Sequence, residues 1–309
     1  MKHAFFLVLL TFFAALHCEA QISKVKKLLV VTTTAGFRHD IDTVERSLSE
    51  IAKESGKFEL EFLRQPPGRP AEPKKVAALR PDANEQQRIA FEAATAKYKE
   101  EFAAFQSADT IWRKTILAKT LEKLSPGSLA GYDGVIFAST TGELPLPDKA
   151  GFLNWIKSGK AFIGFHAATD TLMQWPEYVE MIGGSFKTHG DQVGVDIINA
   201  APKHRSTKHL PSIWKIDLEE IYQFNNYDPK RVHELLILDH HPNNKTPGHF
   251  PLAWTREYGK GRVFYTAIGH RADIWDPNPN LKDRKNPPAT AAAFRQHALA
   301  GILWALGIK

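Results

Sequence analysis

Four histidines of this chain stand in predicted loops: His39, His166, His189 and His270. Imidazole titrates near neutral pH, so such a residue can act as a base, an acid, a metal ligand or a hydrogen-bond donor to a sugar. His39, His166 and His270 directly follow strand-like segments, and ligands of open α/β sheets bind outside the carboxyl ends of such strands. The pattern predicts a shared polar site, although any one of these histidines could instead cap a helix or satisfy buried carbonyl groups.

His166 holds the most informative of these positions. It follows the apolar run 161–165, and small residues suited to the start of a helix come after it. Where a strand feeds a helix in this way, a nucleophile elbow carries Ser or Cys. A histidine is no ordinary acyl-transfer nucleophile, so we expect His166 to be a catalytic acid or base, assisted by His39. Asp170 follows one helical turn later and is expected to orient the imidazole of His166.

Further polar side chains are predicted at the same edge. Thr140 and Thr141 follow the strand-like segment 135–138, and their hydroxyls could bind a polar ligand or cap the next helix. Glu220 and Tyr222 lie two residues apart in another strand-like segment, which places both on one face. We therefore count these four residues among the candidates for substrate binding.

Metal binding is a weaker hypothesis from the sequence. Neutral imidazoles suit Zn, Ni, Cu or Fe, but His39, His166, His189 and His270 show no His-x-His or His-x-x-x-His spacing. We expect no cofactor and no metal, with a divalent ion held by these four histidines as the alternative.

The segments around the loops alternate between strand and helix patterns. Residues 27–33 and 58–63 have strand patterns, and residues 41–54 between them place apolar side chains at helical spacing. This βαβ opening predicts a parallel sheet. Strand-like 135–138 and 161–165, with helix-like 147–158 between them, continue it.

Two departures from this rhythm stand out. The segment of about residues 65–124 begins with a loop rich in Pro and basic residues and continues as helix from residue 84, so we interpret it as a helical insertion. Beyond residue 184, short strands predict an antiparallel β extension, followed by a closing helix at 294–306. The chain is thus expected to form one α/β domain over 21–309, an open, mostly parallel, doubly wound sheet with helices on both faces.

The N-terminus indicates export. A basic start, a short apolar run and a small residue at position 20 predict a cleaved signal peptide over residues 1–20. We therefore expect a periplasmic or secreted protein without stable membrane insertion after cleavage. The only cysteine, Cys18, would be lost, so disulfides and thiolate catalysis are not expected. The net charge of +6 is spread along the chain, and no nucleic-acid-binding motif is present.

Several motifs together resemble the ThuA-like (trehalose-utilisation) family. They are Gly36-Phe37-Arg38-His39, residues 164–170, Gly183-Gly184-x-Phe186-x-x-His189, Glu220-Ile221-Tyr222, and residues 258–270 from Tyr-Gly-Lys-Gly to Gly-His. The resemblance runs from about residue 27 to residue 309. It implies a flavodoxin-like fold similar to class I glutamine amidotransferases, without their cysteine nucleophile, and a link to the catabolism of sugars through 3-keto intermediates.

We therefore expect a sugar-catabolism enzyme that acts on a glycoside or 3-keto-glycoside by histidine acid/base chemistry, with a small carbohydrate as its partner. A keto group acidifies the neighbouring C–H, so a histidine base would suffice. A non-catalytic carbohydrate-binding protein and a histidine-metal hydrolase are the alternatives, whereas glutamine amidotransferase activity is not expected. The oligomeric state is left open. The residues expected to bind substrate are Gly36, Phe37, Arg38, Thr140, Thr141, His189, Glu220, Tyr222 and His270.

Overall fold

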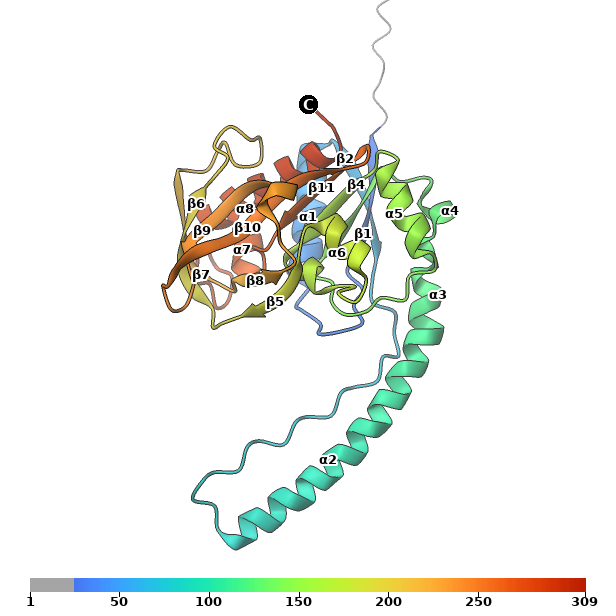
Figure 1. Ribbon diagram of the computed structural model, residues 1–309, viewed down its shortest axis with the longest axis vertical. Coiled ribbons are helices and arrows are strands. Elements are labelled where there is room, and N and C mark those ends of the chain that lie inside the picture. Colours follow the sequence, from blue (N-terminus) through green and yellow to red (C-terminus); the bar gives the residue numbers. More distant parts are fainter. Residues whose placement is uncertain (1–24) are drawn as a thin grey trace, which may run out of the picture.

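A nine-stranded sheet forms the centre of the molecule (Figure 1). The computed structural model describes residues 25–309, so the predicted signal peptide lies outside the described residues. Half of the sheet is parallel. Its strands, in spatial order, are β2 (Phe58–Leu63), β1 (Lys26–Val31), β3 (Gly134–Ala138), β4 (Ala161–Phe165) and β11 (Gly261–Thr266). This is the 2-1-3-4-5 order of flavodoxin-like sheets, and it confirms the predicted open, doubly wound fold.

The other half of the sheet is antiparallel. It continues from β11 through β10 (Pro247–Tyr258), β9 (His233–His240), β6 (Val193–Asn199) and β7 (Ile213–Glu219). A separate antiparallel ribbon pairs β5 (Ser185–His189) with β8 (Tyr222–Asn225). The predicted β extension is therefore present. Strand β5 was not predicted, because its sequence Ser-Phe-Lys-Thr-His lacks the alternation of a half-buried strand.

Helices cover both faces of the sheet, as predicted. Along β1, Leu28 and Val30 point into one hydrophobic core and Leu29 and Val31 into the other, which is the alternation a strand imposes. The first core is closed by α1 (Asp42–Ser55), α7 (Ala272–Trp275) and α8 (Pro288–Ala305). The second is closed by α5 (Lys149–Lys157), α6 (Pro176–Ile182) and the short helices α3 (Ala118–Leu121), η2 (Glu122–Leu124) and α4 (Pro126–Leu129). Single turns η3 (His166–Asp170) and η4 (Pro229–Arg231) lie in loops.

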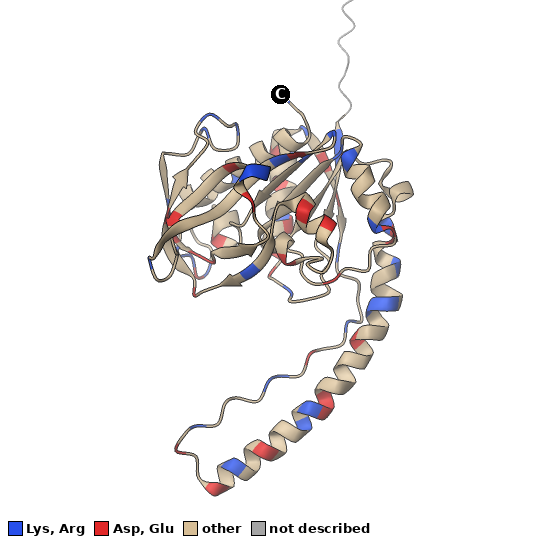
Figure 2. Ribbon diagram, in the orientation of Figure 1, with Lys and Arg blue, Asp and Glu red and all other residues tan. Residues whose placement is uncertain are grey.

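The predicted insertion forms an arm that projects from the body (Figure 1). Helix α2 (Glu85–Trp112) begins with a capping box at Asn84 and continues through a π-helical turn, η1 (Arg113–Leu117). Figure 2 shows charges of both signs along α2. Beyond the arm, the side chains of Leu117, Leu121 and Leu124 are fully buried in the second core. The last part of the predicted insertion is therefore an integral layer of the fold.

The helix of the arm and the extended segment before it each show a regular pattern of half-buried positions. In α2 the half-buried positions Phe91, Thr95, Tyr98, Phe102 and Phe105 alternate at intervals of four and three residues. In the extended segment before it, half-buried positions recur every third residue, at 70, 73, 76 and 79, which is the repeat of polyproline II. Each segment of the arm thus has one less exposed face. The opposite face stays exposed, as at Ile111.

Among residues 25–309, no helix combines the length and the apolar character that crossing a membrane requires.

The packing of α8 against the sheet generates a stability prediction. A Cβ atom added to Gly301 would stand 2.4 Å from ring atoms of the buried Phe264, whereas one added to Gly127 in α4 would meet nothing within 4 Å. Gly301→Ala should lower the free energy of unfolding by about 1–3 kcal/mol, the usual cost of overpacking. Gly127→Ala is the matched control and should be neutral or slightly stabilising. Urea unfolding of both variants measures this, and equal stability of the two would contradict the packing described.

Candidate functional site

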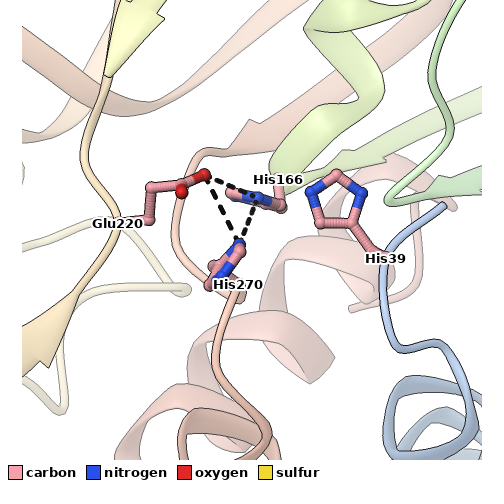
Figure 3. Close-up of side chains that lie close together, drawn as sticks. All are labelled: His39, His166, Glu220 and His270. Atoms are coloured by element: carbon pink, nitrogen blue, oxygen red, sulfur yellow. Dashed lines mark hydrogen bonds and ion pairs between the residues drawn. The ribbon is translucent and has the colours of Figure 1, made fainter. Parts of the chain in front are cut away.

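Four side chains from four separate segments converge at one edge of the sheet (Figure 3). His39 follows β1, His166 follows β4 and His270 follows β11, whereas Glu220 lies between β7 and β8. One donor atom from each lies within 4.8 Å of those of the other three. The first three sit at the carboxyl ends of parallel strands, where the fold is expected to bind ligands. The predicted convergence of His39, His166 and His270 is what the structure shows.

The backbone at His166 turns the side chain inward. Its φ angle of 48° lies in the left-handed region, which a non-glycine residue occupies only at an energetic cost. The side chain is fully buried, whereas the nucleophile of an elbow stands exposed at the top of the sheet. Nδ1 of His166 lies 2.9 Å from the carbonyl oxygen of Ala267. Because that oxygen can only accept, Nδ1 must donate, and the neutral ring has its lone pair on Nε2.

This lone pair faces the other members of the cluster. Nε2 of His166 lies 3.2 Å from Nδ1 of His270 and 3.6 Å from Oε1 of Glu220. Nδ1 of His270 lies 3.4 Å from the same oxygen. These three contacts are the dashed lines of Figure 3. The ring centroid of His39 is 4.9 Å from that of His166 and 5.6 Å from that of His270. The site is thus a compact triangle of donor atoms with a third imidazole beside it.

Burial keeps the imidazoles of the cluster neutral. Loss of solvation, followed by the repulsion of neighbouring imidazoles, lowers the pKa of His39 and of His270 to about 4. The same two causes hold the pKa of the fully buried His166 well below its usual value. Burial raises the pKa of Glu220, and His189 opposes this rise. At neutral pH the site therefore offers unprotonated nitrogens, the form in which histidine binds metals.

Behind the cluster lies a buried acidic residue that sequence analysis missed. Glu219 is fully buried, and its Oε1 accepts hydrogen bonds from the backbone N–H groups of Glu220, at 2.8 Å, and His270, at 3.2 Å. Burial raises its pKa to about 8, although these hydrogen bonds oppose the rise. One carboxyl group thus fixes the backbone of two members of the cluster. An acidic residue at an inward position of a strand is the sequence signal that could have revealed it.

His189 and Tyr222 form the next layer around the cluster. Nδ1 of His189 lies 3.3 Å from Oε2 of Glu220 and 2.9 Å from the carbonyl oxygen of Gly190. Its side chain remains 43% exposed, so it is the most accessible imidazole of the site. The ring of Tyr222 is almost fully buried and lies 4.4 Å from that of His166. Both residues were predicted here, and the structure places both at the site.

Asp170, Thr140 and Thr141 do not have the roles that the sequence predicted for them. The two nitrogens of His166 already face Ala267 and His270, so Asp170 does not orient this ring. Burial raises the pKa of Asp170 to about 6. Thr140 and Thr141 are both buried. The hydroxyl of Thr140 is hydrogen-bonded to the hydroxyl of Thr171, at 2.7 Å. That of Thr141 donates to the carbonyl oxygen of Phe37. These contacts join neighbouring loops, and the hydroxyls are engaged within the protein instead of facing a pocket.

The turn that carries His39 packs tightly against the loop after β3. A Cβ atom at Gly36 would stand 2.7 Å from Oγ1 of Thr141, so only glycine allows this approach. Phe37 is 68% exposed, with its ring 4.9 Å from that of His39, and Arg38 is also exposed. Phe37 and Arg38 are therefore accessible to a ligand, whereas Gly36 only allows the two backbone segments to approach closely.

Arg69, at the base of the arm, is hydrogen-bonded to the same turn. The guanidinium of Arg69 donates to the carbonyl oxygens of Gly36, at 2.8 Å, and Ala35, at 2.9 Å. It also pairs with the buried Asp109 of α2, at 3.2 Å. Trp112 donates from its indole to the carbonyl oxygen of Pro67, at 3.0 Å. The arm is therefore joined by hydrogen bonds to the segment that positions His39.

The geometry of the cluster fits a small divalent cation. In a tetrahedral zinc site with metal–ligand distances of about 2.0–2.1 Å, neighbouring donor atoms lie roughly 3.3–3.4 Å apart. The three separations between His166, His270 and Glu220 are 3.2, 3.4 and 3.6 Å. Three nitrogens and one carboxylate oxygen also suit Zn and other first-row metals. The bond from Nδ1 of His166 to a carbonyl oxygen is the support that metal-bound histidines usually have.

The fold and the site define an α/β protein with a histidine cluster at the carboxyl edge of a flavodoxin-like sheet. The family model described as trehalose utilisation (ThuA) matches residues 91–305, and the chain belongs to this family. This membership indicates a role in sugar metabolism. The match begins within α2, so His39 lies outside it and His166, Glu220 and His270 lie inside. No curated protein is significantly similar in sequence.

Solved structures of ThuA-like proteins share the fold. One from Parabacteroides merdae ATCC 43184 is 17% identical, with a TM-score of 0.60 over 92% of this chain and 91% of that one. Another, from Bacteroides uniformis ATCC 8492, is 18% identical, with a TM-score of 0.55 over 93% and 94%.

The hydrogen bonds between Arg69 and the His39 turn lead to a stability prediction. Arg69→Leu removes two hydrogen bonds to the His39 turn and one partner of the buried Asp109. Charge-assisted hydrogen bonds contribute about 1.5–3 kcal/mol, so we expect a loss of about 2–3 kcal/mol in the free energy of unfolding. Amide hydrogen exchange at residues 35–39 should become faster.

Arg64→Leu is the matched control. Arg64 is 62% exposed and pairs with Glu45, and its guanidinium also lies 4.6 Å from the ring centroid of Phe62. Such surface pairs contribute about 0–1 kcal/mol. If the two variants lose equal stability, or if exchange at 35–39 is unchanged in Arg69→Leu, the arm does not hold the turn.

Proposed function

We propose that this protein is a carbohydrate-processing enzyme that depends on a divalent metal ion held by His166, His270 and Glu220, with His39 beside it. The observation that carries this proposal is the spacing of their donor atoms, 3.2–3.6 Å, around a common centre. Membership of the trehalose-utilisation family supports the sugar substrate.

The geometry favours a ligand role for His166 over the catalytic role expected from the sequence. An acid or base must reach the proton that it transfers. His166 is fully buried, its Nδ1–H is bound to Ala267, and its Nε2 faces His270. Neither nitrogen is left for a sugar. A ligand, by contrast, needs one nitrogen anchored and the other free of a proton, which is the state of this ring.

His189 is better placed for proton transfer. Its Nδ1 faces two acceptors, the Gly190 carbonyl and Glu220, so Nδ1 carries the proton and Nε2 holds the lone pair. The ring is partly exposed next to the cluster. A keto-glycoside suits both parts of the site: the metal ion would polarise the keto oxygen as a Lewis acid. Nε2 of His189 would accept the proton from the adjacent carbon.

Metal content tests the first part of this proposal. Purified protein should hold about one divalent ion per chain by elemental analysis. Stripping with a chelator should lower the melting temperature, because an ion that binds only the folded state stabilises it. Glu220→Gln and His270→Gln should lower metal affinity by at least about 100-fold, above the 10–100-fold effect of outer-shell partners.

The control is a second His–Glu pair on the same protein. His249 and Glu234 lie 2.6 Å apart on the surface, and His249→Gln with Glu234→Gln should leave the metal content unchanged. If the folded wild type neither contains nor is stabilised by Zn²⁺, Mn²⁺, Co²⁺ or Ni²⁺, the metal-dependent function is wrong, and metal-free acid/base chemistry replaces it.

Turnover tests the role of His189. On a 3-keto-disaccharide, His189→Ala should reduce kcat by roughly 10²–10⁴-fold, the usual contribution of a proton-transfer group. Its metal affinity should fall by no more than about 10–100-fold, because His189 contacts Glu220 from outside the donor triangle, so turnover is measured at saturating metal. Its melting temperature should stay near that of the wild type, because the ring is partly exposed. Asp170→Asn provides the comparison for the earlier catalytic assignment and should have a smaller effect. A variant of His189 with full activity would remove it from the mechanism.

A further inference from the structure

The function proposed above uses the base of the arm but gives no role to its length. Helix α2 leaves the body and stands clear of the sheet and of the helices that cover it (Figure 1). Its buried residues, Asp109 and Trp112, both lie at its base. Helices in proteins gain most of their stability from the packing of an apolar face, so the rest of α2 has little packing of this kind with the body.

Two isoleucines are exposed on one face of this helix. Ile89 is 58% exposed and Ile111 is 64% exposed. They lie about six turns apart, so both point to the same side of α2, opposite the half-buried positions such as Phe91 and Tyr98. A β-branched side chain lowers helix propensity, so helix formation alone gives no reason for isoleucine at these exposed positions. Coverage of this face by another chain would give one.

The middle of the same helix carries a block of charges in two halves. Lys97 and Lys99 form the basic half, and Glu100 and Glu101 form the acidic half. All four residues are exposed, and Figure 2 shows both signs near the middle of α2.

The order of these charges favours one relative direction of two helices. Charged pairs between packed helices determine whether the helices run parallel or antiparallel. Two antiparallel copies of α2 would set the basic half of each block against the acidic half of the other. Each Glu100 would then lie between Lys97 and Lys99 of the opposite block, whereas parallel copies would set like charges side by side.

One register satisfies the isoleucines and the charges together. Glu100 lies midway between Ile89 and Ile111, so a two-fold axis beside it places Ile89 of one copy opposite Ile111 of the other. The same axis sets Ala96 opposite Ala104, and the distance between packed helices depends on the size of the side chains at the contact. The exposed face of α2 is therefore complementary to itself in the antiparallel direction.

The charge of α2 does not suit a nucleic acid or an anionic membrane. The helix carries three basic and five acidic side chains, whereas a polyanionic surface attracts an excess of basic ones. A second helix with the same order of charges matches both signs.

We infer that the exposed face of α2 is a dimerisation surface and that its partner is the arm of a second copy of this chain, packed antiparallel about a two-fold axis beside Glu100. This inference depends neither on the metal ion nor on the sugar substrate. In this arrangement the tip of each arm lies beside the base of the other, where Arg69 is hydrogen-bonded to the His39 turn.

Sedimentation equilibrium of the full chain tests for the dimer. Wild type should self-associate, and added salt should weaken the association, because the central charges are exposed. Lys97→Glu with Lys99→Glu makes the whole block acidic, and Glu100→Lys with Glu101→Lys makes it basic. Each double variant alone should associate at least about tenfold more weakly, equivalent to about 1.4 kcal/mol. An equimolar mixture of the two should recover the wild-type association, which also shows that both variants fold.

Lys53→Glu with Lys57→Glu is the matched control. It makes the same charge reversal at exposed positions of the body and should leave the association unchanged. If wild type stays monomeric, or if the double variants of α2 associate as strongly as wild type, α2 is not a dimerisation surface. A mixture that associates as weakly as its components would refute the antiparallel pairing.

Cross-linking tests the register. Ile89→Cys and Ile111→Cys are made as separate chains in a Cys18→Ser background and then mixed. A short thiol-reactive cross-linker should join unlike variants, because their thiols face each other across the axis. It should not join two copies of one variant, whose thiols would lie about 33 Å apart along the helices. Equal cross-linking of like and unlike variants would refute this register.

Discussion

The hydrogen bond from Nδ1 of His166 to the carbonyl oxygen of Ala267 is the interaction on which the site depends. It spans 2.9 Å between the loops after two neighbouring parallel strands, β4 and β11. It determines the tautomer of the imidazole, and with it the direction in which the lone pair on Nε2 points. The left-handed backbone at this residue costs roughly 1–3 kcal/mol, a cost that the packing of the fully buried ring and this hydrogen bond must offset.

The carboxylate of the cluster comes from the other half of the sheet. Glu220 belongs to the connection between β7 and β8, whereas the histidines follow parallel strands. Glu219 joins the two halves, because its buried carboxyl accepts from the backbone of both Glu220 and His270. Such a buried group is costly unless it is hydrogen-bonded. The antiparallel extension is therefore part of the site and supplies its only carboxylate among the four donors.

The fold was predictable because its signals are local. The strand and helix periods of residues 27–63 and the apolar runs at 135–138 and 161–165 match β1, α1, β2, β3 and β4 closely. The position of the histidines after these strands predicted that His39, His166 and His270 would meet. The orientation of His166 could not be predicted in this way. It depends on a backbone carbonyl, that of Ala267, and every residue type carries such a group.

Other features of the site lacked any local sequence signal. Arg69 lies in a segment rich in Pro and basic residues, and only the folded arm brings it to the carbonyl oxygens of Ala35 and Gly36. The absence of a short His-x-His spacing argued against a metal site. That argument applies to ligands on one element, whereas these donors are assembled from four segments. Sequence spacing therefore says nothing about donors that the tertiary fold brings together.

The reach of imidazole explains how a residue at an elbow position can join a cluster of donor atoms instead of standing exposed as a nucleophile. A Ser or Cys at such a turn ends one atom beyond Cβ and attacks from the surface of the turn. The imidazole of His166 extends further, so that one side of its ring is anchored to β11 while Nε2 comes within 3.2 Å of His270. The accessible imidazole of His189, held against Glu220, is the exposed side chain next to the cluster.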